Sequence, residues 1–217
     1  CRKDMGVNST DDLKGKTLGV WFYGNEYPFL SWMSRLGLAT DGSANGVTVL
    51  KQGWGVEPLT EGQAACVSTM SYNEYWVVRD AGYTPEQLTV FKYQAEGAST
   101  LEDGLYVLEK NLGDDSFKDK MVRFVRASMK GWKYAEANPK EAASIILDND
   151  DAGVQTEKHQ IRMMGEIAKL TAGSNGSLDP SDYERTVKVL MSGASDPVIT
   201  KEPSGAWTHD ITNAALN

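Results

Sequence analysis

The sequence predicts an α/β fold in which a mainly parallel sheet is followed by a helix-rich part. In roughly the first hundred residues, short β-rich runs alternate with helical patterns, which implies βαβ units. After Tyr93, apolar residues recur mostly at helical spacing. The 217 residues are enough for one large domain or two small lobes.

Four strands are expected in the first part, and each is followed by a turn or a helical pattern. They cover residues 17–22, 46–50, 65–70 and 88–93. A fifth β-prone run, residues 104–108, stands among helices. A single strand cannot satisfy its own backbone N–H and C=O groups. This run must therefore pair with the first sheet or with a sheet that the chain lacks.

Helical spacing of apolar residues predicts the helices that follow. They cover residues 29–36, 56–63, 72–81, 118–137 and 156–171, with one more that opens at Asp179-Pro180 and stops before Gly193. Asn138-Pro139-Lys140-Glu141 predicts a further helix start, with Asn as N-cap, Pro at the first helical position and Glu three residues after the cap. Residues 195–217 look irregular.

Composition excludes several classes of partner. A net charge of −8 argues against nucleic-acid binding, which needs a basic face. No apolar run approaches the roughly 20 residues that span a bilayer, so direct membrane insertion is not expected.

Few side chains suit catalysis or metal binding. The cysteines are Cys1 and Cys66, the histidines are His159 and His209, and neither pair has the spacing of metal ligands. Cys66 lies in an apolar run, and we expect a small buried residue there rather than a nucleophile. The low cysteine content argues against a disulfide-scaffolded fold and suits either cytoplasm or periplasm. No catalytic residue, metal site or cofactor is expected.

Polar and aromatic residues follow every one of the four predicted strands. In a parallel sheet the carboxyl ends of the strands share one edge, and ligands bind there. Flat rings supply a stacking surface, and a few polar groups fix the orientation of a ligand. The candidate ligand-binding residues are Trp21, Tyr23, Asn25, Glu26, Tyr27, Trp54, Thr69, Tyr72, Asn73, Glu74 and Glu96.

Two roles are expected within this set. Trp21, Tyr23, Tyr27 and Trp54 include the rings that stack on the ligand, unless these rings are simply core of the sheet. Glu26, Asn73 and Glu74 supply contacts to ring nitrogens or to an exocyclic amine. The alternative is that both glutamates only complement the dipoles of the helices that they begin.

Several segments resemble one family of transport proteins. The run Asp-Leu-Lys-Gly-Lys-Thr-Leu-Gly-Val at residues 12–20 is similar to the "DLKGKTVGV" entry to the second lobe of ABC-transporter solute-binding proteins. The group concerned binds nitrate, sulfonates, taurine and pyrimidine precursors of thiamine. The similarity continues through residues 24–29, 61–64, 71–74 and 138–143 and covers essentially the whole chain. Gly-Asn-Glu-Tyr at 24–27 and Tyr-Asn-Glu-Tyr at 72–75 resemble the pyrimidine-precursor branch more narrowly.

The resemblance implies a type II periplasmic-binding-protein-like fold, with two lobes that close on a ligand. Residues 1–11 would be an inter-lobe crossing, 12–93 the α/β second lobe, and 94–217 the return crossing and the helical part of lobe one. The chain would then lack the N-terminal part of lobe one, with which residues 104–108 would pair.

The resemblance also implies a function. The protein would capture a small, flat, polar ligand, a thiamine-type aminopyrimidine in the first place, and deliver it to an ABC permease without chemistry. It would work on the periplasmic or extracellular side of the membrane. Sulfonate, nitrate and other heterocycles stay open as ligands. The enzyme alternative is a pyrimidine synthase of the same superfamily, which consumes its own histidine and pyridoxal phosphate.

Overall fold

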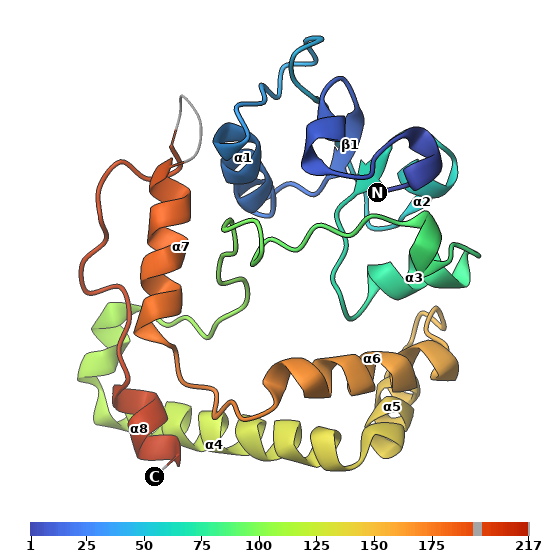
Figure 1. Ribbon diagram of the computed structural model, residues 1–217. Helices are drawn as coiled ribbons and strands as arrows, with labels where there is room; N and C mark the ends of the chain where they lie inside the picture. The colour runs from blue at the N-terminus through green and yellow to red at the C-terminus, as the bar shows by residue number, and fades with distance from the viewer. Residues whose placement is uncertain (193–196, 217) are drawn as a thin grey trace. The chain divides into compact units, whose positions relative to one another are not determined.

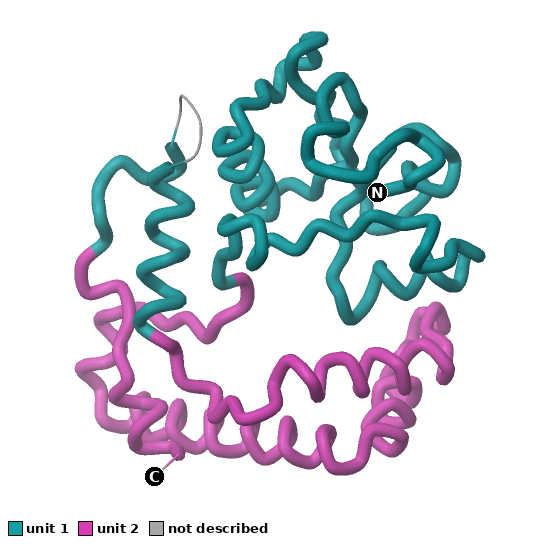
Figure 2. The backbone as a smooth tube through the Cα atoms, viewed as in Figure 1, with its two compact units in different colours: residues 1–101, 180–203 teal, residues 102–179, 204–217 magenta. Residues whose placement is uncertain are grey.

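The computed structural model describes residues 1–192 and 197–216, and these form two compact units. Unit 1 contains residues 1–101 and 180–203, and unit 2 contains residues 102–179 and 204–217 (Figure 2). Mixed α/β structure with a small parallel sheet agrees with the predicted fold class. Each unit is described by itself.

Unit 1 is built on a three-stranded sheet with strand order β2-β1-β3. Figure 1 labels the central strand, β1. The strands are β1 (Thr17–Val20), β2 (Thr48–Lys51) and β3 (Cys66–Val67). Both pairings are parallel, with Leu18 opposite Val49 in β2 and opposite Cys66 in β3. Three of the predicted strands are therefore confirmed, each shorter than expected.

The core of unit 1 lies between the sheet and α1 (Glu26–Arg35). Leu18 and Val20 of β1 are buried with Phe29, Trp32 and Met33 of α1, which is the apolar face that the helical spacing predicted. Helix α7 (Pro180–Ser192) packs against α1. Pro at the first position of α7 agrees with the predicted start, whereas the predicted stop at Gly193 lies outside the described residues.

A second, smaller apolar cluster supports the two short helices of unit 1. Helices α2 (Glu57–Thr60) and α3 (Glu74–Asp80) contribute Leu59 and Val78, which pack with Val56 and Leu88. Three 3₁₀ turns, Lys3–Met5, Thr10–Leu13 and Pro85–Gln87, complete this unit.

The fourth predicted strand, residues 88–93, is wrong. Leu88 makes only an isolated antiparallel bridge with Arg2. The Thr89 amide donates to the Cys1 carbonyl at 2.9 Å, and the Thr89 hydroxyl donates to the Val7 carbonyl at 2.7 Å. The hydrogen bonds of this segment go to the first residues of the chain, so it does not extend the parallel sheet. Its aromatic residues instead cover α1, where Phe91 lies 5.2 Å from Trp32 between ring centroids.

Unit 2 is helical. It contains a 3₁₀ turn, Glu109–Gly113, and the helices α4 (Asp115–Ala137), α5 (Pro139–Asp148), α6 (Glu157–Thr171) and α8 (Asp210–Leu216). Helices α5, α6 and α8 all pack against α4. The carboxylate of Asp114 accepts the Ser116 and Phe117 amides and caps α4, because the first turn of a helix leaves its N–H groups without partners.

Two expectations for this half are wrong, the strand at residues 104–108 and the fully irregular end of the chain. Residues 104–108 form no strand, and Leu105, Tyr106 and Leu108 are exposed. As predicted, Asn138 is the N-cap of α5 and Pro139 is its first residue, although the Asn138 side chain donates to the Tyr134 carbonyl and accepts no amide of the first turn. Part of the stretch expected to be irregular, residues 195–217, is helix α8. Arg126 of α4 donates to the carbonyl oxygens of Ala214 and Ala215 in this helix.

The cysteine expectation also needs correction. Cys66 is buried, as expected, but it forms a disulfide with Cys1 that closes 65 residues of chain. This link was missed because one cysteine begins the chain and the other lies in a strand, and nothing in their spacing brings them together. In the described part of the chain, no helix is both long and apolar enough for a membrane span.

Candidate functional site

The loops that follow the three parallel strands lie at one edge of the sheet. We call residues 21–27, 51–55 and 68–74 together the rim. Parallel pairing places the carboxyl ends of β1, β2 and β3 side by side, so the rim follows directly from the topology. All of it belongs to unit 1.

Gln52 joins two of these loops. Its side-chain nitrogen donates to the carbonyl oxygens of Ser68 at 3.0 Å and Gly55 at 3.1 Å, and its side-chain oxygen accepts the Ser68 amide at 2.9 Å. Gln52 is 6 % exposed, so these bonds form away from water, where unmade bonds are costly. The ends of β2 and β3 are thereby fixed relative to each other.

Trp21 joins another pair of loops. Its indole N–H donates to the carbonyl oxygen of Gly53 at 2.9 Å, which links the loop after β1 to the loop after β2. The ring is half-buried. Trp21 therefore combines a structural bond with a partly accessible face.

Tyr23 and Trp54 are the accessible rings of the rim. Tyr23 is 91 % exposed and Trp54 is 96 % exposed. Tyr23 has a φ of 65° and is the only non-glycine residue with positive φ among the described ones. Such a backbone is strained for a bulky side chain. The alternative that these rings are simply core of the sheet does not hold for Tyr23 and Trp54.

Glu26 and Asn25 follow Tyr23 at the start of α1. The Glu26 carboxylate accepts the Gly24 amide at 2.7 Å, and the Asn25 side chain donates to the Phe22 carbonyl at 3.5 Å. Tyr27 is half-buried. Glu26 thus shapes the turn before α1, and an acidic side chain suits the N-terminus of a helix.

Glu74 has a matching place at the start of α3. Its carboxylate accepts the Met70 amide at 2.9 Å and the Asn73 side chain at 2.7 Å. Thr69 and Tyr72 lie half-buried in the same loop. Both glutamates therefore have a structural task, which leaves the remaining lone pairs of each carboxylate for a ligand.

Glu96 does not belong to the rim. Because residues 88–93 are not a strand of the sheet, Glu96 does not follow a strand end. Its carboxylate accepts the indole N–H of Trp32 on α1 at 3.1 Å. The rim thus has three strand ends rather than the four that the sequence suggested.

Lys51 was not predicted as a site residue. Its ammonium group lies 4.5 Å from the ring centroid of Tyr23 and 5.4 Å from that of Phe22, and it donates to the Tyr23 hydroxyl at 3.2 Å. The available signal was its position directly after the predicted strand at residues 46–50 and directly before Gln52. A lysine at the end of a strand is usually just a solvent-exposed surface residue, so this signal did not single it out.

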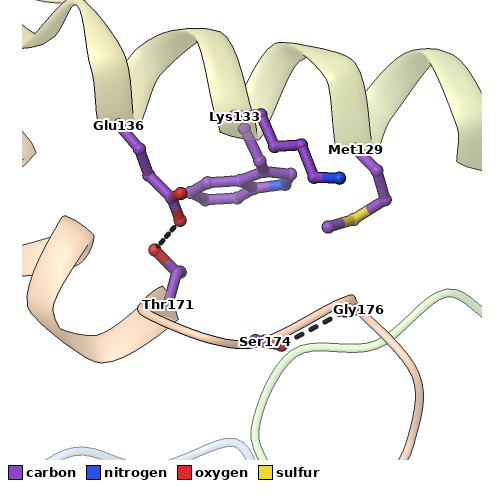
Figure 3. A pocket seen from close by; sticks show the side chains of 7 residues that line it. Met129, Lys133, Glu136, Thr171, Ser174 and Gly176 are labelled. Carbon is purple, nitrogen blue, oxygen red and sulfur yellow. Dashed lines mark hydrogen bonds between the residues drawn. The ribbon is translucent and has the colours of Figure 1, made fainter.

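Two hollows lie in unit 2, and neither contains a predicted site residue. One, of about 180 Å³, is lined from α4 by Met129, Trp132, Lys133 and Glu136, and by Thr171, Ser174 and Gly176. Figure 3 shows Glu136 and Thr171 meeting across it, where the Thr171 hydroxyl donates to the carboxylate. The other is a shallow apolar depression over α4, α5 and α6.

Over the described ranges, no three His, Cys, Asp or Glu side chains gather where a metal ion could bind. What the rim offers instead is stacking surface with hydrogen-bonding groups beside it. Such a set can bind and orient a flat ligand.

Comparison with protein families gave one match, and comparison with curated proteins gave none. The family model described as NMT1/THI5-like matches residues 1–142. The matched range includes the whole sheet and every residue of the rim.

Proposed function

Since the chain belongs to the NMT1/THI5-like family of nitrate-, sulfonate- and thiamine-precursor-binding proteins, we propose that it captures a thiamine-precursor aminopyrimidine. The family has a solute-binding role in transport, and that role holds for this chain. Its partners are then a small-molecule ligand and an ABC permease.

The observation that carries the choice of ligand is the pair of solvent-exposed rings at neighbouring strand ends. Tyr23 follows β1 and Trp54 follows β2, and both are more than nine-tenths exposed. A protein that had no ligand for these rings would gain by burying them, because exposed aromatic surface is unfavourable in water. A flat heterocycle covers such surface by stacking.

The polar residues of the rim favour a ligand that carries an amine. Carboxylates accept hydrogen bonds from amines and repel anions, and Glu26 and Glu74 stand at the starts of two rim helices. Asn73, hydrogen-bonded to Glu74, adds an amide that can pair with a ring nitrogen.

The place of action that fits this role is the periplasmic or extracellular side of a membrane. The Cys1–Cys66 disulfide supports it, because disulfides persist in oxidising compartments and are rare in the cytosol. The proposed mechanism is closure of two lobes on the ligand, with no chemical step and no cofactor.

Titration calorimetry of the complete protein with 4-aminopyrimidines tests this proposal. We expect saturable binding that weakens when Glu26 or Glu74 is replaced by glutamine. A pyrimidine whose amine is dimethylated, and so cannot donate, should bind weakly to wild type and respond little to either change. Tight sulfonate binding that both substitutions leave unaltered would refute the aminopyrimidine.

The enzyme alternative requires a different measurement. A pyrimidine synthase loaded with pyridoxal phosphate would release product and lose a histidine, which mass spectrometry of protein and supernatant detects. A pure receptor returns its ligand unchanged and keeps its mass.

A further inference from the structure

The rim carries a cation that has no acidic partner among the described side chains. Lys51 is exposed at the end of β2, and none of the ion pairs between described side chains includes it. Its contacts are the ring faces of Tyr23 and Phe22 and the Tyr23 hydroxyl. An ammonium group has three N–H donors, so donors remain for a ligand.

The contacts hold the ammonium group at the stacking surface. A lysine side chain in water moves freely among many rotamers. The Tyr23 ring attracts the charge from 4.5 Å, since a cation is favoured over the face of an aromatic ring. Lys51 is thus placed beside the ring that we assign to stacking.

The backbone at Tyr23 is a second, independent observation. With φ at 65°, this tyrosine occupies the left-handed region in which glycine is at ease and L side chains are strained. The next residue, Gly24, also has a positive φ. An exposed tyrosine therefore occupies a position in this turn at which glycine would be free of strain. Strained residues cluster at functional sites, where the strained position serves the site. Here that position brings the ring to Lys51.

We propose that Lys51 selects, among flat heterocycles, those that carry an oxyanion substituent such as a carboxylate, sulfonate or phosphate. The inference rests on the proposed function, because it assumes that the ligand stacks at the rim. The chain as a whole has a net charge of −8 and repels anions. A local cation such as Lys51 can turn that repulsion into a preference.

The amine preference and the oxyanion preference are compatible because they use different atoms. Glu26 and Glu74 begin α1 and α3, whereas Lys51 ends β2. A ring that carries an amine on one edge and an oxyanion on another can contact both groups at once.

A matched pair of probes tests the proposal in the complete protein. The pair is 4-aminopyrimidine-5-carboxylate and the neutral 5-carboxamide of the same ring, which differ in charge but hardly in shape. We expect wild type to bind the carboxylate about tenfold more tightly or better, the usual effect of one charge-assisted hydrogen bond. Lys51→Gln should abolish this preference and leave carboxamide binding within about twofold.

Two control variants separate local from general charge. Lys51→Arg keeps the cation and should keep the preference. Lys14→Gln removes the same charge from an exposed lysine before β1, at the opposite end of the strand from the rim, and should behave as wild type.

The failures are distinguishable. Equal binding of both probes by wild type, or a preference that survives in Lys51→Gln, overturns the role of Lys51 and leaves the solute-binding site standing. A second failure would be that neither probe binds and that Trp54→Ala changes the binding of no heterocycle. That result overturns the rim as a binding site and the inference with it.

Discussion

The side-chain amide of Gln52 pairs with the backbone of Ser68 as another strand would, donating at 3.0 Å and accepting at 2.9 Å. The two residues follow β2 and β3, which are not neighbours, because β1 lies between them. The amide can cross the end of β1 because Gly19 has no side chain. A Cβ built on Gly19 would lie 3.3 Å from the Gln52 side-chain oxygen and 2.9 Å from Val67.

This pairing predicts that Gln52→Ala destabilises unit 1. The change removes the three hydrogen bonds that the buried Gln52 side chain makes with Ser68 and Gly55. We expect a loss of about 1–3 kcal/mol in the free energy of unfolding. Urea denaturation followed by tryptophan fluorescence measures it. Gln63→Ala, at an exposed glutamine, is the matched control and should change stability by less than about 0.5 kcal/mol. Equal effects of the two substitutions would contradict the structural role of Gln52.

Trp54→Ala should separate binding from stability. Its ring is 96 % exposed, so its removal costs folding little, while loss of a stacking partner weakens heterocycle binding by about 1–3 kcal/mol. Calorimetry and thermal denaturation of the same sample measure both quantities. Trp32→Ala serves as the opposite case, because Trp32 is buried in the core and its loss should lower stability first. Unchanged affinity in Trp54→Ala would remove Trp54 from the site.

The strained backbone of Tyr23 predicts an order between two substitutions that both remove the ring. Tyr23→Gly should be more stable than Tyr23→Ala by about 1 kcal/mol, because only glycine accepts φ near 65° without strain. Denaturant midpoints of the two variants measure the difference. Both should lose affinity for the ligand alike, since both lack the stacking ring. If Tyr23→Ala proved the more stable, the left-handed backbone at this position would be wrong.

The Cys1–Cys66 disulfide predicts a strong redox dependence of stability. A link that closes 65 residues of chain stabilises the fold by about 4 kcal/mol through the entropy of the unfolded state. Denaturation with and without dithiothreitol should show this loss, and the double variant Cys1→Ser, Cys66→Ala should match the reduced protein. That variant should no longer respond to the reductant. Free thiols detected in the oxidised, unfolded wild type would show that the bond does not form.

Short-range patterns determined most of the elements. The alternation of apolar runs with helical spacing gave three strands and their parallel direction, and the apolar stripe of Phe29, Trp32 and Met33 gave the buried face of α1. These features depend on residues within one turn or one strand of each other. For the same reason the rim was predictable: parallel strands must end at one edge.

Tertiary structure decided what depends on partners far away in the chain. Residues 88–93 have the composition of a strand, yet the first residues of the chain take hydrogen bonds that a sheet neighbour would need. Cys66 forms a disulfide with Cys1, 65 residues away, and Glu96 accepts a hydrogen bond from Trp32. The sequence by itself determined which residues stand at the strand ends. Only the fold decided that Tyr23 and Trp54 face solvent, whereas Gln52 is buried between two loops. Only the fold decided, too, that Lys51 lies against an aromatic ring. Burial and cation–ring contact arise only once distant segments of the chain have packed.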